Sequence, residues 1–109
     1  MNVEIIKNTI EYLEKHYPQN EKVKWHICEG YDCIEVPDGT RCFGCFDPMQ
    51  LTIYLATDIQ EPEETLIETT AHEYKHFIQM CEGKPFDEEE AETFALWIVK
   101  KLMDTPTTP

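Results

Sequence analysis

Apolar residues recur at intervals of three and four positions through the first 17 residues of the chain. This spacing is typical of an amphipathic helix with one buried face, and Pro18 and Asn20 end it. The apolar face consists of Val3, Ile6, Ile10, Leu13 and Tyr17. We therefore expect the chain to begin with a helix that packs against the rest of the protein.

The middle of the chain alternates between apolar and polar residues, which is the period of a β-strand. Residues 22–27 and the segment Leu51–Leu55 both follow this pattern. Between them, Cys33–Val36 has the pattern of a further strand. Pro37-Asp38-Gly39 has the chemistry of a tight turn, so we expect a hairpin that leads into Arg41–Phe46.

Helical periodicity returns near residue 61. The segment Glu61-Pro62-Glu63-Glu64 is typical of a helix start, because proline fits the first turn and acidic side chains favour the positive end of the helix dipole. The helix should extend to about Glu82, where Gly83 and Pro85 end it.

The sequence predicts one more helix at the C-terminal end. Asp87 can cap it, with Glu90 as its capping-box partner, and it should extend to about Met103. Asp104–Pro109 is rich in Thr and Pro and is expected to be an irregular tail. The order of helix, strands and two helices predicts an α+β fold, a compact single domain over residues 1–109 with a small mixed sheet.

The net charge of −13 changes which partners the chain can have. A strongly acidic chain repels phosphate backbones and acidic lipid surfaces, so we expect neither nucleic acid nor a membrane as partner. An acidic cleft would favour cationic or metal ligands. The segment Met1–Lys7 lacks the pattern of a secretory signal, and no apolar run is long enough for a membrane span, so a cytoplasmic location is expected.

The segment His72-Glu73-Tyr74-Lys75-His76 carries the most informative chemistry. Two histidines four residues apart project from one helix face and can bind one zinc ion. Glu73 lies beside the first of them, where it can take a proton from a water on the metal. On a helical wheel His72 and His76 fall on the face opposite the apolar stripe that contains Tyr74, together with Thr65, Thr69 and Gln79.

A catalytic zinc site needs a third protein ligand, and the last helix offers several acids. Its apolar stripe contains Ala91, Phe94, Ala95, Ile98 and Leu102. Glu88 and Glu92 lie on one flank of this stripe, and Glu88 is closer to the junction between the two helices. We expect Glu88 to be the ligand and Glu92 to hydrogen-bond a ligand histidine, with Glu92 as the competing ligand.

These motifs resemble the gluzincin zinc peptidases. His72-Glu73-x-x-His76 followed by Glu88-x-x-Ala91-Glu92-x-Phe94-Ala95 is similar to their ligand helix and the helix after it. The chain length most resembles the minigluzincins, which are single-domain proteins. The resemblance implies His72, His76 and Glu88 as zinc ligands, Glu73 as general base and acid, and Glu92 as an acid behind the ligands.

The resemblance also implies how substrate and latency would work. The strand before the zinc helix often pairs with an extended substrate in that family, which assigns this role to Leu51–Leu55; a plain core strand is the alternative. Some minigluzincins block their own cleft with the C-terminal segment. Asp104–Pro109 is the equivalent here, with Asp104 near the metal, and a frayed end is the alternative.

Four of the five cysteines lie close together in the sequence. Three hypotheses fit this cluster: a second, structural zinc site, one or two disulfides, or free thiols. A hairpin at Pro37–Gly39 would bring the cysteines together. The cluster consists of Cys28, Cys33, Cys42 and Cys45.

The sequence thus favours a zinc-dependent peptidase that hydrolyses a peptide or protein substrate through a metal-bound water. Tyr31, Tyr54 and His26 are candidates to stabilise the oxyanion. The alternative is a zinc-binding regulatory or interaction module without turnover. A latent enzyme, shut by its tail or by self-association, is a third hypothesis, and the oligomeric state stays open.

Overall fold

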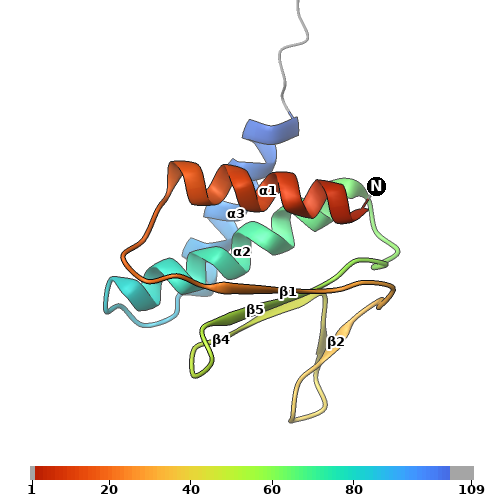
Figure 1. Ribbon diagram of the computed structural model, residues 1–109, viewed down its shortest axis with the longest axis horizontal. Coiled ribbons are helices and arrows are strands. Elements are labelled where there is room, and N and C mark those ends of the chain that lie inside the picture. Colours follow the sequence, from red (N-terminus) through yellow and green to blue (C-terminus); the bar gives the residue numbers. More distant parts are fainter. Residues whose placement is uncertain (1, 104–109) are drawn as a thin grey trace, which may run out of the picture.

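Three helices cover one face of a small sheet in the computed structural model, which describes residues 2–103 (Figure 1). They are α1 (Asn2–His16), α2 (Glu63–Cys81) and α3 (Glu88–Met103). Together with the sheet they confirm the α+β prediction. The expected tail Asp104–Pro109, and Asp104 as a residue near the metal, lie outside the described residues. No helix between residues 2 and 103 is long and apolar enough to cross a lipid bilayer.

The main sheet has three strands in the order β1 (Lys24–Cys28), β5 (Thr52–Ala56), β4 (Gly44–Asp47). β5 is parallel to β1 and antiparallel to β4. The expectation that the strand at Leu51–Leu55 pairs with substrate is therefore wrong. β5 has hydrogen-bonded neighbours on both sides and offers no free edge, whereas β4 is paired on one side only.

A hairpin of β2 (Ile34–Glu35) and β3 (Arg41–Cys42) projects from the opposite side of the sheet to the helices (Figure 1). Its turn contains Gly39 at φ +90°, a conformation that side chains disfavour. The hairpin prediction is confirmed, but the expected single strand over 41–46 divides at Phe43. Cys42 pairs with Ile34, while the chain from Gly44 onward pairs with β5.

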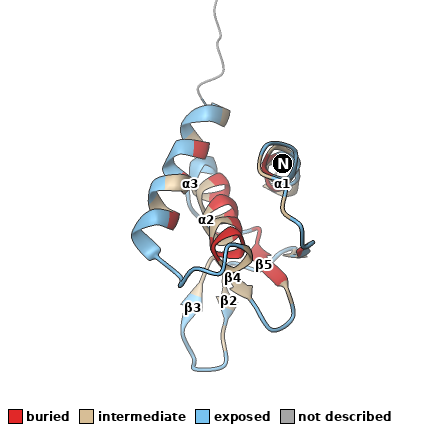
Figure 2. Ribbon diagram, turned by 90° about the vertical axis from the view of Figure 1, so that its left-hand side faces the viewer, coloured by how far each residue is buried: buried red, intermediate tan, exposed pale blue. Residues whose placement is uncertain are grey.

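Helix α2 lies between α1 and α3 and contains many of the buried residues (Figure 2). On its α1 side, the Tyr74 ring stacks on Trp25, and the Tyr74 hydroxyl donates a hydrogen bond of 2.8 Å to the Tyr17 carbonyl. Phe77 packs edge-on against Phe46 of β4. The apolar side predicted for this helix is therefore its contact with the sheet and α1.

The prediction that both zinc-motif histidines lie on an exposed face is wrong for His76, which is only 6% exposed. The other side of α2 packs against α3, so a wheel centred on Tyr74 identifies only one of its two buried sides. Phe86, in the connection between the helices, lies over the imidazole ring of His76. His72 is half-buried.

The connection between α2 and α3 contains the helix stop and the helix cap that the sequence predicts. Gly83 at φ +71° ends α2, and the Lys84 N–H donates to the Gln79 carbonyl. Asp87 caps α3 by accepting the Glu90 N–H at 3.0 Å. The second half of the expected capping box is replaced, because the Glu90 carboxylate accepts a hydrogen bond from the Gln79 side chain instead.

Candidate metal centre

Two imidazole nitrogens and one carboxylate converge where α2 meets the first residue of α3. His72 Nε2 lies 2.9 Å from Glu88 Oε1, and His76 Nε2 lies 3.2 Å from Glu88 Oε2. The ligand atoms of the three side chains all lie within 4.8 Å of one another. Glu88, rather than Glu92, therefore completes the group of side chains that could hold a metal ion.

The other nitrogen of each imidazole is held by a hydrogen-bond acceptor. His72 Nδ1 lies 3.3 Å from Glu92 Oε1, the contact expected of Glu92, and His76 Nδ1 lies 2.9 Å from Gln79 Oε1. Gln79 and the carboxylates of Glu88 and Glu92 are all acceptors, so an imidazole that gives its Nδ1 proton to the outer partner has its Nε2 lone pair free for a metal ion.

The donor atoms of His72, His76 and Glu88 are of the kinds that bind a metal ion. Either a proton or a metal ion must lie between each Nε2 and the Glu88 carboxylate, because a bare nitrogen lone pair and a carboxylate oxygen repel one another. Two histidines and one glutamate, with the far ring nitrogens held by second partners, are the donor set of catalytic zinc sites. The side chains therefore fit a divalent ion such as zinc.

Gln79 is the residue of this centre that the sequence reasoning missed. It is 0% exposed, and its amide makes four hydrogen bonds. Oε1 accepts from His76 Nδ1 and from the Asp87 N–H at 3.1 Å; Nε2 donates to the Asp87 carbonyl at 3.1 Å and to Glu90 at 2.8 Å. These partners fix the orientation of the amide, so one side chain joins a candidate ligand to the start of α3.

Glu73 lies beside His72 in a cleft of about 280 Å³, whose lining includes neither His76 nor Glu88. Burial raises the pKa of Glu73 to about 7, although His72 and His76 act to lower it. A carboxyl with a pKa near neutrality can both accept and return a proton at physiological pH. The cleft is lined by Cys42, Phe43, Gly44, Thr65, Glu68, Thr69, His72, Glu73 and Glu92.

The pKa values of Glu68 and Glu88 depart from the ordinary value of a glutamate in opposite directions. A hydrogen bond with Glu92 raises the pKa of Glu68 to about 7, which places these two carboxyls side by side across α2 and α3. Burial acts to raise the pKa of Glu88, but His72 and His76 outweigh it and lower that pKa below its ordinary value. Glu88 therefore stays charged between the two imidazoles.

Gly44 allows the edge strand β4 to approach the cleft. A Cβ at this position would lie 2.8 Å from Leu55 Cδ2 and 2.8 Å from Thr69 Cγ2, so no other residue fits without movement. The Phe43 carbonyl accepts from the Ala56 N–H, so the next N–H, that of Gly44, points away from β5. This edge of β4 thus lies at the wall of the cleft, where the Gly44 N–H hydrogen-bonds the Cys42 thiol and the Phe46 N–H hydrogen-bonds the Glu73 carboxylate.

The three residues expected to stabilise an oxyanion lie elsewhere. Tyr54 pairs with His26 on the face of the sheet away from the helices, and both line a separate hollow with Tyr31. This expectation is wrong because β5 turns Ile53 and Leu55 toward α2, so alternation turns Tyr54 the other way.

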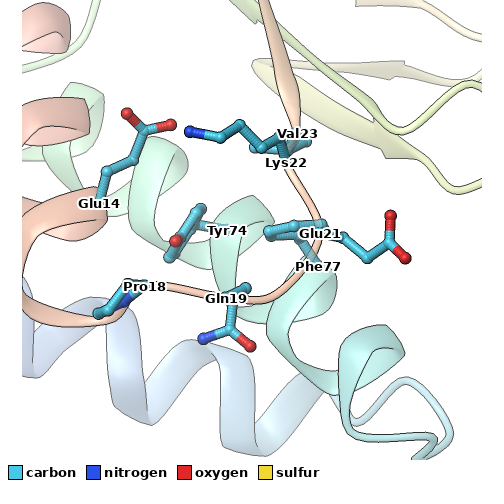
Figure 3. A pocket seen from close by; sticks show the side chains of 8 residues that line it. All are labelled: Glu14, Pro18, Gln19, Glu21, Lys22, Val23, Tyr74 and Phe77. Atoms are coloured by element: carbon cyan, nitrogen blue, oxygen red, sulfur yellow. The ribbon is translucent and has the colours of Figure 1, made fainter.

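A further hollow lies on the α1 side of α2 (Figure 3). The connection from α1 to β1 closes it over Tyr74 and Phe77, and its volume is about 100 Å³. None of the three candidate ligands reaches it. Its lining consists of Glu14, Pro18, Gln19, Glu21, Lys22, Val23, Tyr74 and Phe77.

All five cysteines are free thiols in the structure. The hairpin register places Cys33 beside the Ile34–Cys42 pair, and Cys42 and Cys45 hydrogen-bond each other. Burial raises the pKa of each thiol, that of Cys45 to about 11. Within residues 2–103 the four clustered cysteines do not form a compact group of metal ligands; only His72, His76 and Glu88 do.

Comparison with known proteins finds no matching family model, no similar curated protein and no similar solved structure. The function must therefore be inferred from the geometry of the centre itself.

Proposed function

We propose that this protein is a zinc-dependent peptidase of the gluzincin type, with His72, His76 and Glu88 as metal ligands and Glu73 as the general base and acid. The single observation that carries the proposal is the convergence of two Nε2 atoms on the Glu88 carboxylate, while both Nδ1 atoms face the acceptors Glu92 and Gln79. A cation resolves this arrangement, and the donor set suits zinc.

A zinc ion held there would supply a Lewis acid and lower the pKa of water toward neutrality. The chain supplies the proton transfers. Glu73 lies in the cleft next to His72, where it can take a proton and later return it to a leaving amine. With one metal ion bound by both Nε2 atoms, the ring protons lie on Nδ1, where Glu92 and Gln79 would accept them.

Peptide binding in this proposal uses β4 rather than β5. An extended segment can pair with a strand that has a free edge, and specificity then comes from pockets for alternate side chains. The Gly44 N–H points to that edge beside the cleft, where a peptide carbonyl would replace the Cys42 thiol as its acceptor. The substrate is thus proposed to be a peptide in extended conformation, and a cytoplasmic location, where free thiols persist, is part of the same proposal.

Three variants test the proposal through two readouts, metal content and hydrolysis of quenched fluorescent peptides. We expect one zinc per wild-type chain, its loss in His76→Ala, and its retention in Glu73→Gln with loss of hydrolysis of about 1000-fold or more. Glu64→Gln, an exposed glutamate near the start of the same helix, is the matched control and should retain both properties.

The outcomes separate the competing functions. Hydrolysis that survives in Glu73→Gln rules out the proposed proton transfer. Zinc that binds without turnover in the wild-type protein favours the regulatory or interaction module instead. An absence of zinc after reconstitution removes the basis of both functions.

A further inference from the structure

Two cysteines where the hairpin joins the main sheet lie three residues apart in the sequence and in contact in the structure. Cys42 ends β3, and Cys45 lies in β4. In a continuous strand, residues three apart are separated by about 10 Å and turn their side chains to opposite faces. The chain instead bends at Phe43, where it passes from the hairpin to the main sheet, and this bend brings the two thiols together.

Hydrogen bonds hold the Cys42 sulfur at this bend. The sulfur accepts one bond from the Gly44 N–H and one from the Cys45 thiol. Its own proton points to the Ile34 carbonyl, which lies 3.7 Å from the sulfur. The bond from Gly44, two residues further on, folds the Cys42 side chain back over the bend. The fold thus keeps the two sulfur atoms within reach of each other.

The other three cysteines lie apart from this pair. Cys28 and Cys33 line the hollow on the outer face of the sheet, and neither Cys42 nor Cys45 is part of that lining. Cys28 belongs to β1, and β5 lies between β1 and β4. Cys81 is the last residue of α2. Cys42 and Cys45 are therefore the pair that the fold places in contact.

The surroundings of Cys42 and Cys45 determine how readily the pair reacts. Both side chains are half-buried, and Cys42 lines the cleft, so a small oxidant can reach them. Burial raises the pKa of both thiols, and the Glu73 carboxylate adds to both shifts. Thiols that stay protonated react slowly, and a disulfide is easiest to reduce when the fold stabilises the thiolate that is released. We therefore expect slow oxidation at neutral pH and a disulfide that is not easily reduced.

We propose that Cys42 and Cys45 form a reversible disulfide at the wall of the cleft, with a small disulfide such as oxidised glutathione as the oxidant. The Cys42 thiolate, which accepts two hydrogen bonds, attacks the oxidant and forms a mixed disulfide, and one glutathione thiolate leaves. Cys45 then loses its proton to water and attacks the Cys42 sulfur, which releases the second glutathione. Two protein thiols become one disulfide, and one oxidised glutathione becomes two thiols that take up the two protons. The proposal does not rest on the peptidase function, because neither the metal ligands nor Glu73 takes part in this exchange.

Trypsin separates the pair from the other cysteines, because residues 42–75 contain Cys42 and Cys45 and no further cysteine. The full chain is equilibrated with mixtures of reduced and oxidised glutathione, its remaining thiols are alkylated, and its tryptic peptides are weighed by mass spectrometry. We expect peptide 42–75 to lose two hydrogens while Cys28, Cys33 and Cys81 are alkylated. The same chain unfolded in urea should need about 10-fold more oxidised glutathione to form this bond, because folding already holds the sulfurs together.

Two variants test the proposed order of the steps. Cys45→Ser should retain one glutathione on Cys42, since the thiol that releases it is absent. Cys81→Ser is the matched control and should form the disulfide as wild type does. Equal oxidation of the folded and unfolded chains overturns the proposal, and so does a disulfide of Cys28 or Cys33 that forms at a lower share of oxidised glutathione. A zinc ion that is lost in Cys45→Ser but kept in His76→Ala would show that the thiols bind metal instead, and it also overturns the proposal.

Discussion

Replacing Gln79 by methionine should weaken both the fold and metal binding. Methionine keeps the length of the side chain and its burial but makes none of the four hydrogen bonds of the amide. Glu90 is exposed and can turn to water, whereas His76 Nδ1 and both backbone groups of Asp87 lose their partner. Three groups at about 1 kcal/mol each predict a loss of about 3 kcal/mol in the free energy of unfolding.

Loss of the hydrogen bond between Gln79 and His76 should also weaken metal binding. Without the Gln79 carbonyl oxygen, the His76 ring is free to change its orientation and tautomer, so zinc affinity should fall by about 10- to 100-fold. Gln79→Glu separates the two effects. It retains the acceptor for His76 but removes the amide donor and faces the Glu90 carboxylate, so it should lower stability more than zinc affinity.

Urea unfolding of the metal-free protein measures the first quantity, and competition with a chromogenic chelator measures the second. Gln50→Met is the matched control, because Gln50 is exposed and lies in a turn far along the chain from the centre. Methionine at position 79 with unchanged zinc affinity would refute the role assigned to Gln79. Unchanged unfolding would show that the network contributes nothing to the junction of α2 and α3.

Further predictions address the fold and the metal. Burial raises the pKa of Tyr74 to about 12, above about 10 in an unfolded chain, so its stabilising contribution is complete below about pH 10 and is lost as the pH rises through about 12. Urea midpoints of wild type and Tyr74→Phe should therefore converge in that window; a constant difference contradicts the assignment. Gly44→Ala should cost about 1–3 kcal/mol, measured by thermal unfolding, because its Cβ overlaps Leu55 and Thr69. Removing zinc with a chelator should lower the melting temperature of wild type but leave that of His76→Ala unchanged, and equal shifts would show that the metal binds elsewhere.

Local signals predicted the elements well because each signal acts within a few residues. The apolar face of α1, the Gly83 stop and the Asp87 cap depend on helix geometry alone, and the structure contains all three. The spacing of His72 and His76 likewise fixes their common face. The choice of Glu88 over Glu92 followed from its place at the start of α3, where it meets the end of α2.

The sequence did not predict which strand would be central, because alternation describes one strand and not its neighbours. A usable signal was present: residues 51–57 carry no charged side chain, as suits a strand with neighbours on both sides, whereas β1 contains Lys24. Gly44 inside a strand pattern similarly indicates a close approach of another element. Both signals depend on the assembled sheet and are ambiguous before the partner strands are known.

The burial of His76 and Gln79 could not be derived from a helical wheel of α2 alone. A helical wheel finds the side with most apolar residues, whereas the side of α2 that faces α3 carries histidine and glutamine instead. Polar residues occupy a buried interface when they satisfy one another, as Gln79 does. Gln79 lies three residues after His76, within hydrogen-bonding reach on a helix, and this spacing is the signal that sequence reasoning can use.

The candidate ligands come from two helices that are joined by a short connection, and no strand contributes one. Pairing of β1 with β5, by contrast, joins residues that are far apart in the chain, as Lys24 and Thr52 are. Contacts between near neighbours in the chain form faster than distant ones, because less chain entropy is lost in closing the loop. We therefore expect the helical hairpin to assemble early in folding, so that an ion captured there would act as a template on which the sheet is completed.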